Sequence, residues 1–540
     1  MHASPTYTLG LDFGTLSVRA LLVDTADGHA VAEATSPYAH GVMDRTLPDG
    51  TPLPPRFALQ HPLDYLDSMS AAIRQVLDQA NTEHGVTPDR IAALGVDFTS
   101  CTMLPVDESG SPLCFSPAFA EEPHAYVKLW KHHGATEEAA ELTALAAARG
   151  EEWLSAYGGT ISCEWMFPKV LETLRHAPGV FEATHRFTEA ADWLSYLLTG
   201  RETHATSFAG YKGLWQDGRY PSDGFLTALD PALHGVVGSK ICPMVDPVDG
   251  IAGRLDAYGA TLTGLPEGTP VALPIIDAHA ALPATGMTRP GDLTLILGTS
   301  TCHILNADRL RAIQGVCGYV KDGVIPELYT YEAGQAAVGD CFDWFVRSCV
   351  PAEYTHAAAE RGMSIHAYLC ELAEGKAPGE SGVMALDWWN GNRSILMDQT
   401  LTGTLVGLTL TTRPEDIYRA LIEATAFGTR VILEQFEGGD LPIRRIMATG
   451  GIARKNSMMM QIYADVLNRP IEVSTATQAG ALGSAIYAAV AGGVYPIVTE
   501  AADAMAAKAE RVYTPDPKAV EAYDGMFVRF KELHDFFGKR

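Results

Sequence analysis

The stretch Tyr7-Thr-Leu-Gly-Leu-Asp-Phe-Gly-Thr-Leu-Ser-Val-Arg-Ala-Leu-Leu-Val-Asp24 places two apolar, β-prone runs on either side of a short polar turn. Two such runs joined by a glycine-containing loop predict a β-hairpin. The turn carries Asp12, Gly14, Thr15 and Ser17. Glycine lets backbone N–H groups approach an anion closely. The stretch therefore predicts a turn that grips phosphate, with an ordinary hairpin turn as the alternative.

A similar pattern recurs at Gly291-Asp-Leu-Thr-Leu-Ile-Leu-Gly-Thr-Ser-Thr-Cys-His-Ile-Leu305. An apolar strand again meets a glycine and hydroxyl residues, here Gly298, Thr299 and Ser300, and a second strand returns. Each hairpin stands near the start of one half of the chain. The pair predicts two related α/β domains that face one another across a nucleotide. This architecture is the duplicated ribonuclease-H-like ATPase fold, also seen in actin and hexokinase.

The length and composition set further bounds. A chain of 540 residues exceeds the size at which one hydrophobic core keeps growing, so two domains are expected. Its 47% hydrophobic and 19% charged residues are ordinary for a globular protein. The formal net charge of -26 disfavours nucleic acid and anionic membranes as main partners, because both need a basic surface. Binding of ATP would need local help from backbone amides, a few cations and a divalent metal.

The cysteines, the N-terminal residues and the apolar runs indicate the cellular compartment that is expected for the protein. Nine cysteines stand singly, with no CxxC pair and no Cys/His ligand spacing, so a disulfide framework or structural zinc is not expected. An odd count fits a reducing compartment. The N-terminus lacks a basic region followed by an apolar core, and no apolar run approaches the length of a membrane span. The expected location is cytoplasmic.

Residue spacing predicts the main helices and loops. Apolar residues recur at helical intervals from Pro62 to about Ala80, which predicts a helix. A capping box at Thr412–Glu415 opens a second, long helix. Small residues at Ala479–Ala491 predict a third helix that packs in the core. Proline, glycine and aspartate are frequent in Pro37–Pro62, which predicts a surface loop. The same residue types at positions 245–270 predict a crossing between domains.

Two apolar strands lead into polar residues. The predicted strand Ile91–Phe98 meets Thr99-Ser-Cys-Thr102, and ligands of open α/β sheets sit beyond the carboxyl ends of strands. The apolar run Val271–Ile276 is followed by Asp277, and a buried carboxylate is costly unless it is hydrogen-bonded, at a strand end or functional. We favour function for Asp277. His279 would share its strand face, where a packing role is favoured.

Three further positions offer polar groups. Lys212 lies between glycines and aromatics, where it could cover an apolar face with its stem or point into a polar cleft. Glu332 and Gln335 precede a predicted helix. A predicted strand ends at Gly450-Gly451 before another helix. Such a turn lets a planar or anionic ligand approach the backbone, or permits tight packing of the strand on the helix.

In this order and spacing, the motifs resemble the FGGY family of carbohydrate kinases over nearly the whole chain. Each motif is weak by itself, and the set is specific. The resemblance rests on Gly10-Leu-Asp-Phe-Gly-Thr15, Asp97-Phe-Thr-Ser-Cys-Thr-Met-Leu-Pro105, Pro123–His133, Tyr157-Gly-Gly, Glu164-Trp165, Ala209-Gly-Tyr-Lys212, Ile276-Asp-Ala-His279, Gly298-Thr-Ser300, Tyr331-Glu-Ala-Gly-Gln335, Asn392–Asp398 and Thr449–Asn456.

The resemblance implies two ribonuclease-H-like domains with a cleft between them, residues 1-258 binding sugar and residues 259-540 binding ATP. It implies transfer of the γ-phosphoryl group of MgATP to O5 of L-ribulose, which gives L-ribulose 5-phosphate in L-arabinose catabolism. Xylulose-phosphorylating members carry a Gln-Met-His-Gly type of motif where this chain has Asp97-Phe-Thr-Ser-Cys-Thr102. A homodimer is compatible with the resemblance.

The resemblance also implies roles for individual residues. Asp277 would accept the proton of the reacting hydroxyl, and Asp12 would hold Mg²⁺ through water. The residues that would meet the sugar are Ser100, Lys212, Asp277 and Glu332. Those that would meet the ATP phosphates are Gly14, Thr15, Ser17, Gly298, Thr299 and Ser300. Those on the adenosine side are Gln335, Gly450, Gly451 and Asn456.

The chain departs from the family pattern at two places. Ser100 stands where alanine is usual, and Leu273-Pro-Ile275 stands before Asp277 where a small residue is usual. An altered sugar preference is therefore an open alternative, with D-ribulose as one candidate. A second alternative is an actin-like or chaperone-like ATPase, which would need no acceptor base. A dinucleotide dehydrogenase is disfavoured, because no G-x-G-x-x-G motif opens the first helix.

Overall fold

The computed structural model describes residues 6–539, and the contacts within it divide the chain into two compact units. Unit 1 runs to Thr288 and also contains Tyr319–Thr330 and Gln478–Ala507. Unit 2 contains Arg289–Gly318, Tyr331–Thr477 and the chain from Lys508 on. No helix within residues 6–539 is both long and apolar enough to cross a membrane.

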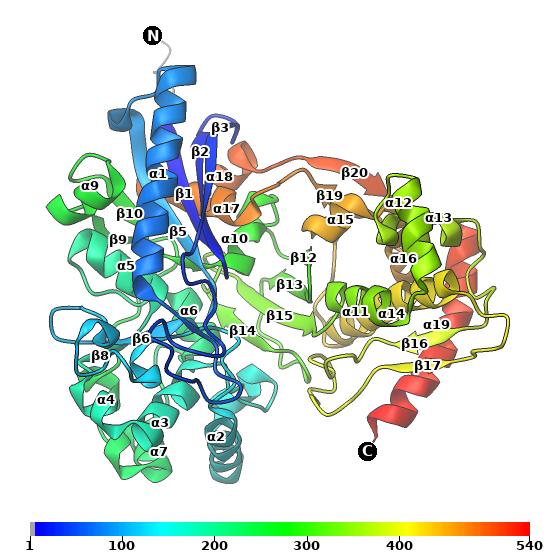
Figure 1. The fold of residues 1–540 in the computed structure, drawn as a ribbon, viewed down its shortest axis with the longest axis horizontal. Coiled ribbons are helices and arrows are strands. Elements are labelled where there is room, and N and C mark those ends of the chain that lie inside the picture. The colour runs from blue at the N-terminus through cyan, green and yellow to red at the C-terminus, as the bar shows by residue number, and fades with distance from the viewer. Residues whose placement is uncertain (1–5, 540) are drawn as a thin grey trace. The chain divides into compact units, whose positions relative to one another are not determined.

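The main sheet of unit 1 has the strand order β3-β2-β1-β5-β10-β9, with β11 also paired to β5 (Figure 1). The first predicted hairpin is confirmed, because β1 and β2 pair antiparallel from Tyr7↔Asp24 to Phe13↔Val18. The predicted strand at β5 is also confirmed and runs parallel to β1. The strands are β1 (Tyr7–Phe13), β2 (Ser17–Asp24), β3 (Ala30–Pro37), β5 (Ile91–Phe98), β9 (Ile251–Arg254), β10 (Pro270–Ala272) and β11 (Ile275–Ile276).

Helices cover this sheet and extend unit 1 beyond it (Figure 1). The predicted helix after Pro62 is confirmed and ends at His84, because Gly85 takes a left-handed conformation with φ 64°. The helices are α1 (Pro62–His84), α2 (Thr136–Arg149), α3 (Met166–His176), α4 (Pro178–Ala183), α5 (Ala190–Thr199), α6 (Thr206–Lys212), α7 (Asp223–Leu229), α8 (Val236–Ser239), α9 (Ala257–Thr263), α10 (Asp277–Ala284), α17 (Ala479–Ala491) and α18 (Val498–Met505).

Two glycines determine how closely α17 packs on β1 and β5. A Cβ atom on Gly10 would lie 1.8 Å from a carbonyl oxygen of α17, and one on Gly95 would lie 2.0 Å from another. Only glycine permits this approach of the two backbones. Because strand side chains alternate between faces, Asp12 and Asp97, two residues further on, point to the same α17 face. Phe13 points to the other face, edge-on to Tyr65 of α1.

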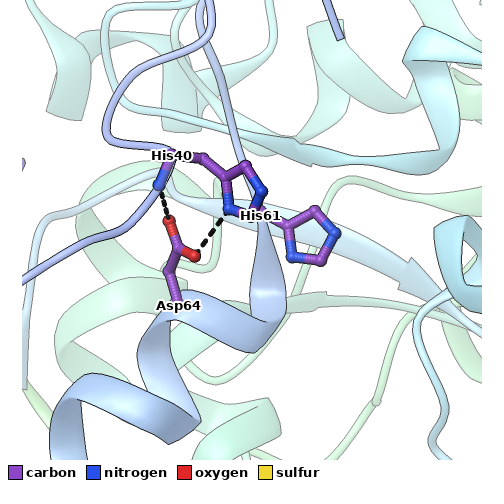
Figure 2. Close-up of side chains that lie close together, drawn as sticks. All are labelled: His40, His61 and Asp64. Atoms are coloured by element: carbon purple, nitrogen blue, oxygen red, sulfur yellow. Dashed lines mark hydrogen bonds and ion pairs between the residues drawn. The ribbon is translucent and has the colours of Figure 1, made fainter. Parts of the chain in front are cut away.

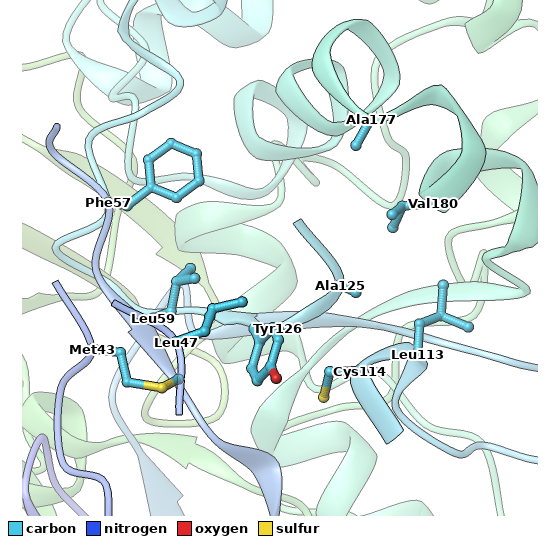
Figure 3. Close-up of a cluster of buried hydrophobic side chains, with 10 residues drawn as sticks. All are labelled: Met43, Leu47, Phe57, Leu59, Leu113, Cys114, Ala125, Tyr126, Ala177 and Val180. Atoms are coloured by element: carbon cyan, nitrogen blue, oxygen red, sulfur yellow. The ribbon is translucent and has the colours of Figure 1, made fainter. Parts of the chain in front are cut away.

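A second sheet of unit 1 has the order β4-β7-β6-β8, formed by β4 (Leu59–Gln60), β6 (Met103–Val106), β7 (Val127–Lys128) and β8 (Arg186–Glu189). The prediction of a surface loop at Pro37–Pro62 is wrong for its apolar side chains. Met43, Leu47, Phe57 and Leu59 are buried, and they belong to a hydrophobic cluster (Figure 3). Apolar burial thus fixes a segment whose composition indicated a loop. The other members are Leu113, Cys114, Ala125, Tyr126, Ala177 and Val180.

Residues 245–270, predicted as a crossing between domains, instead form part of unit 1. Here β9 pairs with β10, and α9 packs against α1 and α5. Unit 1 continues to Thr288 because β11 pairs with β5 and α10 packs against α17. Unit 1 therefore extends past residue 259, and the first change to unit 2 comes after Thr288. As a boundary between the two family domains, residues 258 and 259 stay a prediction.

The main sheet of unit 2 contains β15, β13, β12, β18, β19 and β20 in this order. The second predicted hairpin is confirmed, because β12 and β13 pair antiparallel. The strands are β12 (Asp292–Leu297), β13 (Thr301–Ala307), β15 (Tyr329–Gln335), β18 (Arg445–Thr449), β19 (Ile471–Ser474) and β20 (Ala509–Tyr513), with a separate pair β16 (Met384–Leu386) and β17 (Thr404–Val406). The assignment to units changes within β14 (Gly318–Lys321) and β15.

The helices of unit 2 include the long predicted one, which is confirmed as α14. Its capping box lies one residue later than predicted, because the Asp416 carboxylate accepts from the Arg413 N–H at 2.8 Å. The helices are α11 (Gly339–Cys349), α12 (Ala352–Glu360), α13 (Ile365–Glu374), α14 (Pro414–Gly438), α15 (Gly451–Lys455), α16 (Ser457–Leu467) and α19 (Pro517–Gly538).

Candidate functional site

Two carboxylates lie side by side at the carboxyl edge of the unit 1 sheet. Parallel register places Asp12 of β1 opposite Asp97 of β5. Both face Gly480 near the start of α17, where an added Cβ would lie 3.0 Å from an Asp12 oxygen and 3.1 Å from Asp97 Oδ1. Asp12 Oδ2 also accepts a hydrogen bond from Arg19 Nη1 at 2.8 Å, across the hairpin. The close approach of α17 therefore leaves both carboxylates at one small site.

Asp97 is fully buried, and only one of its two carboxylate oxygens has a hydrogen-bond partner among residues 6–539. Its Oδ2 accepts from Ser484 Oγ at 2.7 Å, whereas its Oδ1 has no hydrogen-bond partner among residues 6–539. Burial raises the pKa of Asp97 well above its usual range, and the negative charges of Asp12 and Asp277 raise it further. Sequence reasoning did not include Asp97 among the site residues. The repeated Gly-x-Asp spacing at Gly10 and Gly95 was a signal that could have found it.

The turn of the first hairpin is held from three sides. Gly14 N–H donates to Ser17 O at 3.0 Å and closes the turn. Gln60 Nε2 donates to Thr15 O at 2.8 Å, and Trp130 Nε1 donates to Thr15 Oγ1 at 3.1 Å. Gln60 and Trp130 were not predicted, because both lie far from the turn in sequence. The turn is thus a fixed element, and phosphate binding by Gly14, Thr15 and Ser17 stays a prediction.

The residues after β5 form a tight polar tip around Ser100. The Thr99 and Thr102 hydroxyls lie 2.8 Å apart, and Cys101 adopts a left-handed backbone conformation with φ 54°. Ser100 is half-buried between them. Lys212, the last residue of α6, is buried with its ammonium 5.8 Å from the centre of the Trp165 ring. This ring contact decides neither alternative, a stem that covers an apolar face or an ammonium in a polar cleft, and contact of Lys212 with sugar stays a prediction.

Asp277 is not inside a strand but opens a helix. β11 ends at Ile276, and Asp277 is the first residue of α10, with Oδ1 accepting from the Ala278 N–H at 2.7 Å. The positive end of a helix stabilises a carboxylate in this position. The prediction that His279 shares a strand face is wrong, since His279 lies on α10 with its ring 4.3 Å from that of Tyr211. The packing role favoured for His279 is consistent with this contact.

A group of two histidines and an aspartate lies at the start of α1, beside Gln60. Figure 2 shows that His40 and Asp64 form a closed pair. Asp64 accepts from the His40 N–H at 2.9 Å and lies 2.8 Å from His40 Nδ1. The His61 ring stacks 4.6 Å from that of His40, and its Nδ1 accepts from the Leu63 N–H. These side chains could ligate a cation, but their existing contacts already account for the group as a cap of α1.

The second hairpin turn meets the start of α11 within unit 2. Gly298 N–H donates to Ser300 O at 2.9 Å, and Thr299 O accepts from the Val338 N–H at 2.8 Å. A Cβ on Gly339 would lie 2.7 Å from Gly298 O, so a glycine is needed where α11 begins. Thr299 is exposed. Gly298, Thr299 and Ser300 thus stand together, and their contact with phosphate stays a prediction.

The glycine turn after β18 lies against the same hairpin. Gly450 has φ 100°, and a Cβ there would lie 2.4 Å from Leu297 O. By contrast, a Cβ on Gly451 would meet nothing within 4 Å, so space is open above this residue. Asn456 caps α16, since its Oδ1 accepts from the Met459 N–H at 2.9 Å. Unit 2 therefore brings Gly450 against the second hairpin, and the short helix α15 separates Gly450 from Asn456.

Glu332 and Gln335 lie on β15, which is followed by α11, so both residues precede a helix as predicted. Glu332 is half-buried, and its backbone oxygen accepts from the Cys317 N–H at 2.8 Å. Gln335 is buried, with Nε2 donating to Asp387 Oδ2 at 2.6 Å and Oε1 accepting from Thr429 Oγ1 at 3.0 Å. The Gln335 amide therefore joins β15 to α14 within the core, and its contact with adenosine stays a prediction.

The carboxylates of unit 1 suit a divalent cation. Mg²⁺ prefers oxygen ligands and binds through one or two carboxylates together with water and phosphate. Asp12 and Asp97 both face Gly480, and the buried Oδ1 of Asp97 has no other partner within residues 6–539. A third carboxylate lies at the same edge of the sheet, because β11 pairs with β5 beside Asp97 and Asp277 directly follows β11. These residues fit a Mg²⁺ ion by donor type and charge.

Comparison with known proteins identifies the family of this chain. The C-terminal and N-terminal domain models of the FGGY family of carbohydrate kinases match residues 293–492 and 7–283. A ribulokinase of Geobacillus thermodenitrificans is 46% identical over 540 residues, covering 99% of this chain and 95% of that protein. One of Mycolicibacterium smegmatis is 47% identical over 539 residues, with the same coverage.

Solved structures agree at the level of the fold. The crystal structure of a xylulose kinase from Rhodospirillum rubrum has a TM-score of 0.82 and 26% sequence identity, covering 99% of this chain and all of that one. The two matched ranges contain the turns of both hairpins. The chain therefore belongs to the FGGY family of carbohydrate kinases.

Proposed function

We propose that the protein is a ribulokinase that transfers the γ-phosphoryl group of ATP to O5 of L-ribulose, giving L-ribulose 5-phosphate and ADP in L-arabinose catabolism. The full-length relatives named ribulokinase support this substrate class. The observation that carries the chemistry is the position of Asp277 at the start of α10, near Asp97 and at the edge of the sheet that holds Asp12. A carboxylate there can serve as a base toward an acceptor hydroxyl.

Asp277 receives the proton of the O5 hydroxyl in this proposal. The O5–H bond breaks, an O5–phosphorus bond forms, and the bond from the γ-phosphorus to its bridging oxygen breaks, so that ADP leaves with that electron pair. The transition state of phosphoryl transfer is loose and spreads charge over the equatorial oxygens, so catalysis depends on alignment and electrostatics. An ordinary ionised aspartate is sufficient, because proton transfer can occur late.

The remaining site residues orient the two substrates. Lys212, Ser100 and Glu332 would bind sugar hydroxyls, and residues 1-258 would form the sugar-binding domain. The hydroxyls and glycine backbones of the two hairpin turns would bind phosphate, with residues 259-540 as the ATP-binding domain. The phosphate contacts would come from Gly14, Thr15, Ser17, Gly298, Thr299 and Ser300, and the adenosine contacts from Gln335, Gly450, Gly451 and Asn456.

Asp12 and Asp97 would hold Mg²⁺, Asp12 through water. When bound, the ion offsets the negative charge of the phosphates and fixes their orientation. The chain itself contributes Arg19, which holds one oxygen of Asp12, and Ser484, which holds one oxygen of Asp97. These two contacts fix both carboxylates before any ligand binds.

ADP release measured against a panel of ketopentoses and polyols tests the substrate. We expect the highest kcat/KM with L-ribulose and little ADP release without sugar. A higher kcat/KM with D-ribulose would show that D-ribulose, and not L-ribulose, is the preferred substrate. Ser100 in place of alanine is the sequence feature that would favour this result. Rapid ATP turnover without any sugar would instead support an actin-like or chaperone-like ATPase.

The variant Asp277→Asn tests the base. The amide keeps the size and the helix-start position of the carboxylate but cannot accept the proton. We expect sugar binding to persist and kcat to fall by at least 100-fold, within the range for loss of general base catalysis. A kcat within a few-fold of wild type would show that another group takes the proton.

A further inference from the structure

Two lysines that the proposed chemistry does not use lie next to the polar tip around Ser100. Lys128 and Lys169 are both fully buried, which is rare for lysine unless its charge is compensated. Lys128 has an obvious partner, because its Nζ donates to Glu172 Oε2 at 2.6 Å and to Thr173 Oγ1 at 2.7 Å. His132 Nε2 lies 3.0 Å from the same glutamate. This lysine is compensated within a local ionic group.

Lys169 is held differently, by backbone carbonyl groups. Its Nζ donates to Cys101 O at 2.5 Å, to Leu129 O at 2.9 Å and to Lys128 O at 3.4 Å. Burial lowers the pKa of Lys169, while the charge of nearby Glu189 raises it. Placing an ammonium here costs free energy of desolvation. In return, one cation fixes the carbonyl groups of two separate chain segments.

Both segments belong to the candidate site. Cys101 follows Ser100 at the tip of β5, and its left-handed backbone turns its carbonyl group toward Lys169. Leu129 precedes Trp130, whose indole N–H donates to Thr15 Oγ1 in the first hairpin turn. The Lys169 ammonium therefore connects the tip at Ser100 with the first hairpin turn: it bonds directly to Cys101 O on one side, and on the other it bonds to Leu129 O, whose neighbour Trp130 bonds to Thr15. All of these contacts lie within unit 1.

We propose that Lys169 is a positioning residue for the acceptor sugar: it fixes the backbone of the tip that presents Ser100, and through Leu129 and Trp130 it keeps this tip in register with the hairpin turn. Lys169 does not touch the reacting atoms. The proposal rests on the proposed function, because it assigns the tip to sugar binding. The alternative is that Lys169 only stabilises the core, as Lys128 does through Glu172.

The variant Lys169→Met separates these two roles. Methionine fills the same volume without a donor, so the Cys101 and Leu129 carbonyl groups lose their partner. We expect the KM for L-ribulose to rise at least tenfold, with kcat changed less than threefold. Trp130→Phe removes only the hydrogen bond to Thr15. This second variant should raise the KM for ATP and leave that for the sugar within twofold.

The matched control is the double variant Lys128→Met/Glu172→Gln, which removes the neighbouring ionic pair without leaving a buried charge. It should lower the melting temperature and leave the KM for the sugar within twofold. If Lys169→Met does not fold, Lys169→Gln keeps N–H donors on a shorter side chain, and it should show the same rise in KM to a smaller degree.

The proposal is overturned if the Lys169 variants melt at a lower temperature but keep the wild-type KM, or if the control raises the sugar KM equally. Failure of the proposed function looks different, because the wild type would then prefer another acceptor in the panel. In that case the same KM ratio is measured with that acceptor, and the test of Lys169 still applies.

Discussion

At the scale of single residues, the decisive pattern is a glycine two positions before an aspartate. Gly10 and Gly95 let α17 approach, and the alternation of strand side chains then turns Asp12 and Asp97 toward the same helix. A short sequence motif thus sets both a backbone distance and the place of a charge. The cost is a buried carboxylate at Asp97 with one unpartnered oxygen among residues 6–539.

The variant Asp97→Asn should affect stability and activity in opposite directions. Burial and the charge of Asp12 raise the pKa of Asp97, which means that its charged form is disfavoured in the folded protein. An amide removes that charge and keeps the hydrogen bond from Ser484. We expect a higher melting temperature near pH 8 by differential scanning fluorimetry and a kcat reduced at least tenfold.

Ser484→Ala is the control for Asp97. It removes the only hydrogen bond to the carboxylate among residues 6–539 and should lower the melting temperature. A decrease in melting temperature for Asp97→Asn would show that the aspartate charge stabilises the fold, contrary to this account.

At the scale of elements, buried charges stand at the junctions between strands and helices. Glu189 ends β8 and precedes α5, is fully buried, and has no hydrogen-bond partner for either carboxylate oxygen among residues 6–539. Burial raises the pKa of Glu189 from 4.5 to about 7, against the lowering effect of the Lys169 charge. The junction is therefore sensitive to pH near neutrality.

The variant Glu189→Gln should flatten the dependence of stability on pH. A folded-state pKa above the unfolded value means that Glu189 contributes stability that is fully present below pH 4.5 and is lost as the pH rises through about 7. Each unit of difference in pKa corresponds to about 1.4 kcal/mol. We expect the variant to melt at a higher temperature than wild type at pH 8 and at a similar temperature at pH 4.5.

Glu532→Gln on the exposed side of α19 is the matched control, because this glutamate is exposed to solvent. Its melting curves should follow those of wild type at both pH values. Equal effects of Glu189→Gln at pH 4.5 and pH 8 would show that packing, and not titration, causes the change.

At the scale of the whole molecule, unit 1 is completed by a segment from near the end of the chain. Gln478–Ala507 supplies α17 and α18, and α17 covers β1 and β5 through the glycine contacts. Without α17, the face of these two strands that carries Gly10, Asp12, Gly95 and Asp97 would lose its cover. The first strand of the chain thus depends on a helix more than 450 residues later.

Two truncations test this dependence. A chain that ends at Thr477 lacks α17 and α18, whereas a chain that ends at Ala507 keeps both and loses β20 and α19 of unit 2. Hydrogen exchange of β1 should be fast in the shorter chain and slow in the longer one, because exchange reports local opening. Slow exchange of β1 in the chain that ends at Thr477 would contradict the role of α17.

Local sequence patterns predicted much of the fold. The two hairpins, β5, α1 and α14 followed from apolar spacing and glycine punctuation, and all five are present. The patterns failed where burial depends on distant partners. Pro37–Pro62 has the composition of a loop, yet Met43 and Phe57 are buried in a cluster with residues far along the chain. The strand expected around Asp277 also proved to be the start of a helix.

The sequence by itself determined two similar hairpins, one carrying Asp12 and the other Gly298. It also determined the order of motifs that identifies the family. The tertiary structure decided that Asp97 joins Asp12, because strand register pairs residues 85 positions apart. It also decided that Lys169 holds Cys101 and Leu129 together. The physical reason is that periodicity and turn chemistry act between near neighbours, whereas these contacts form only when distant segments pack and exclude water.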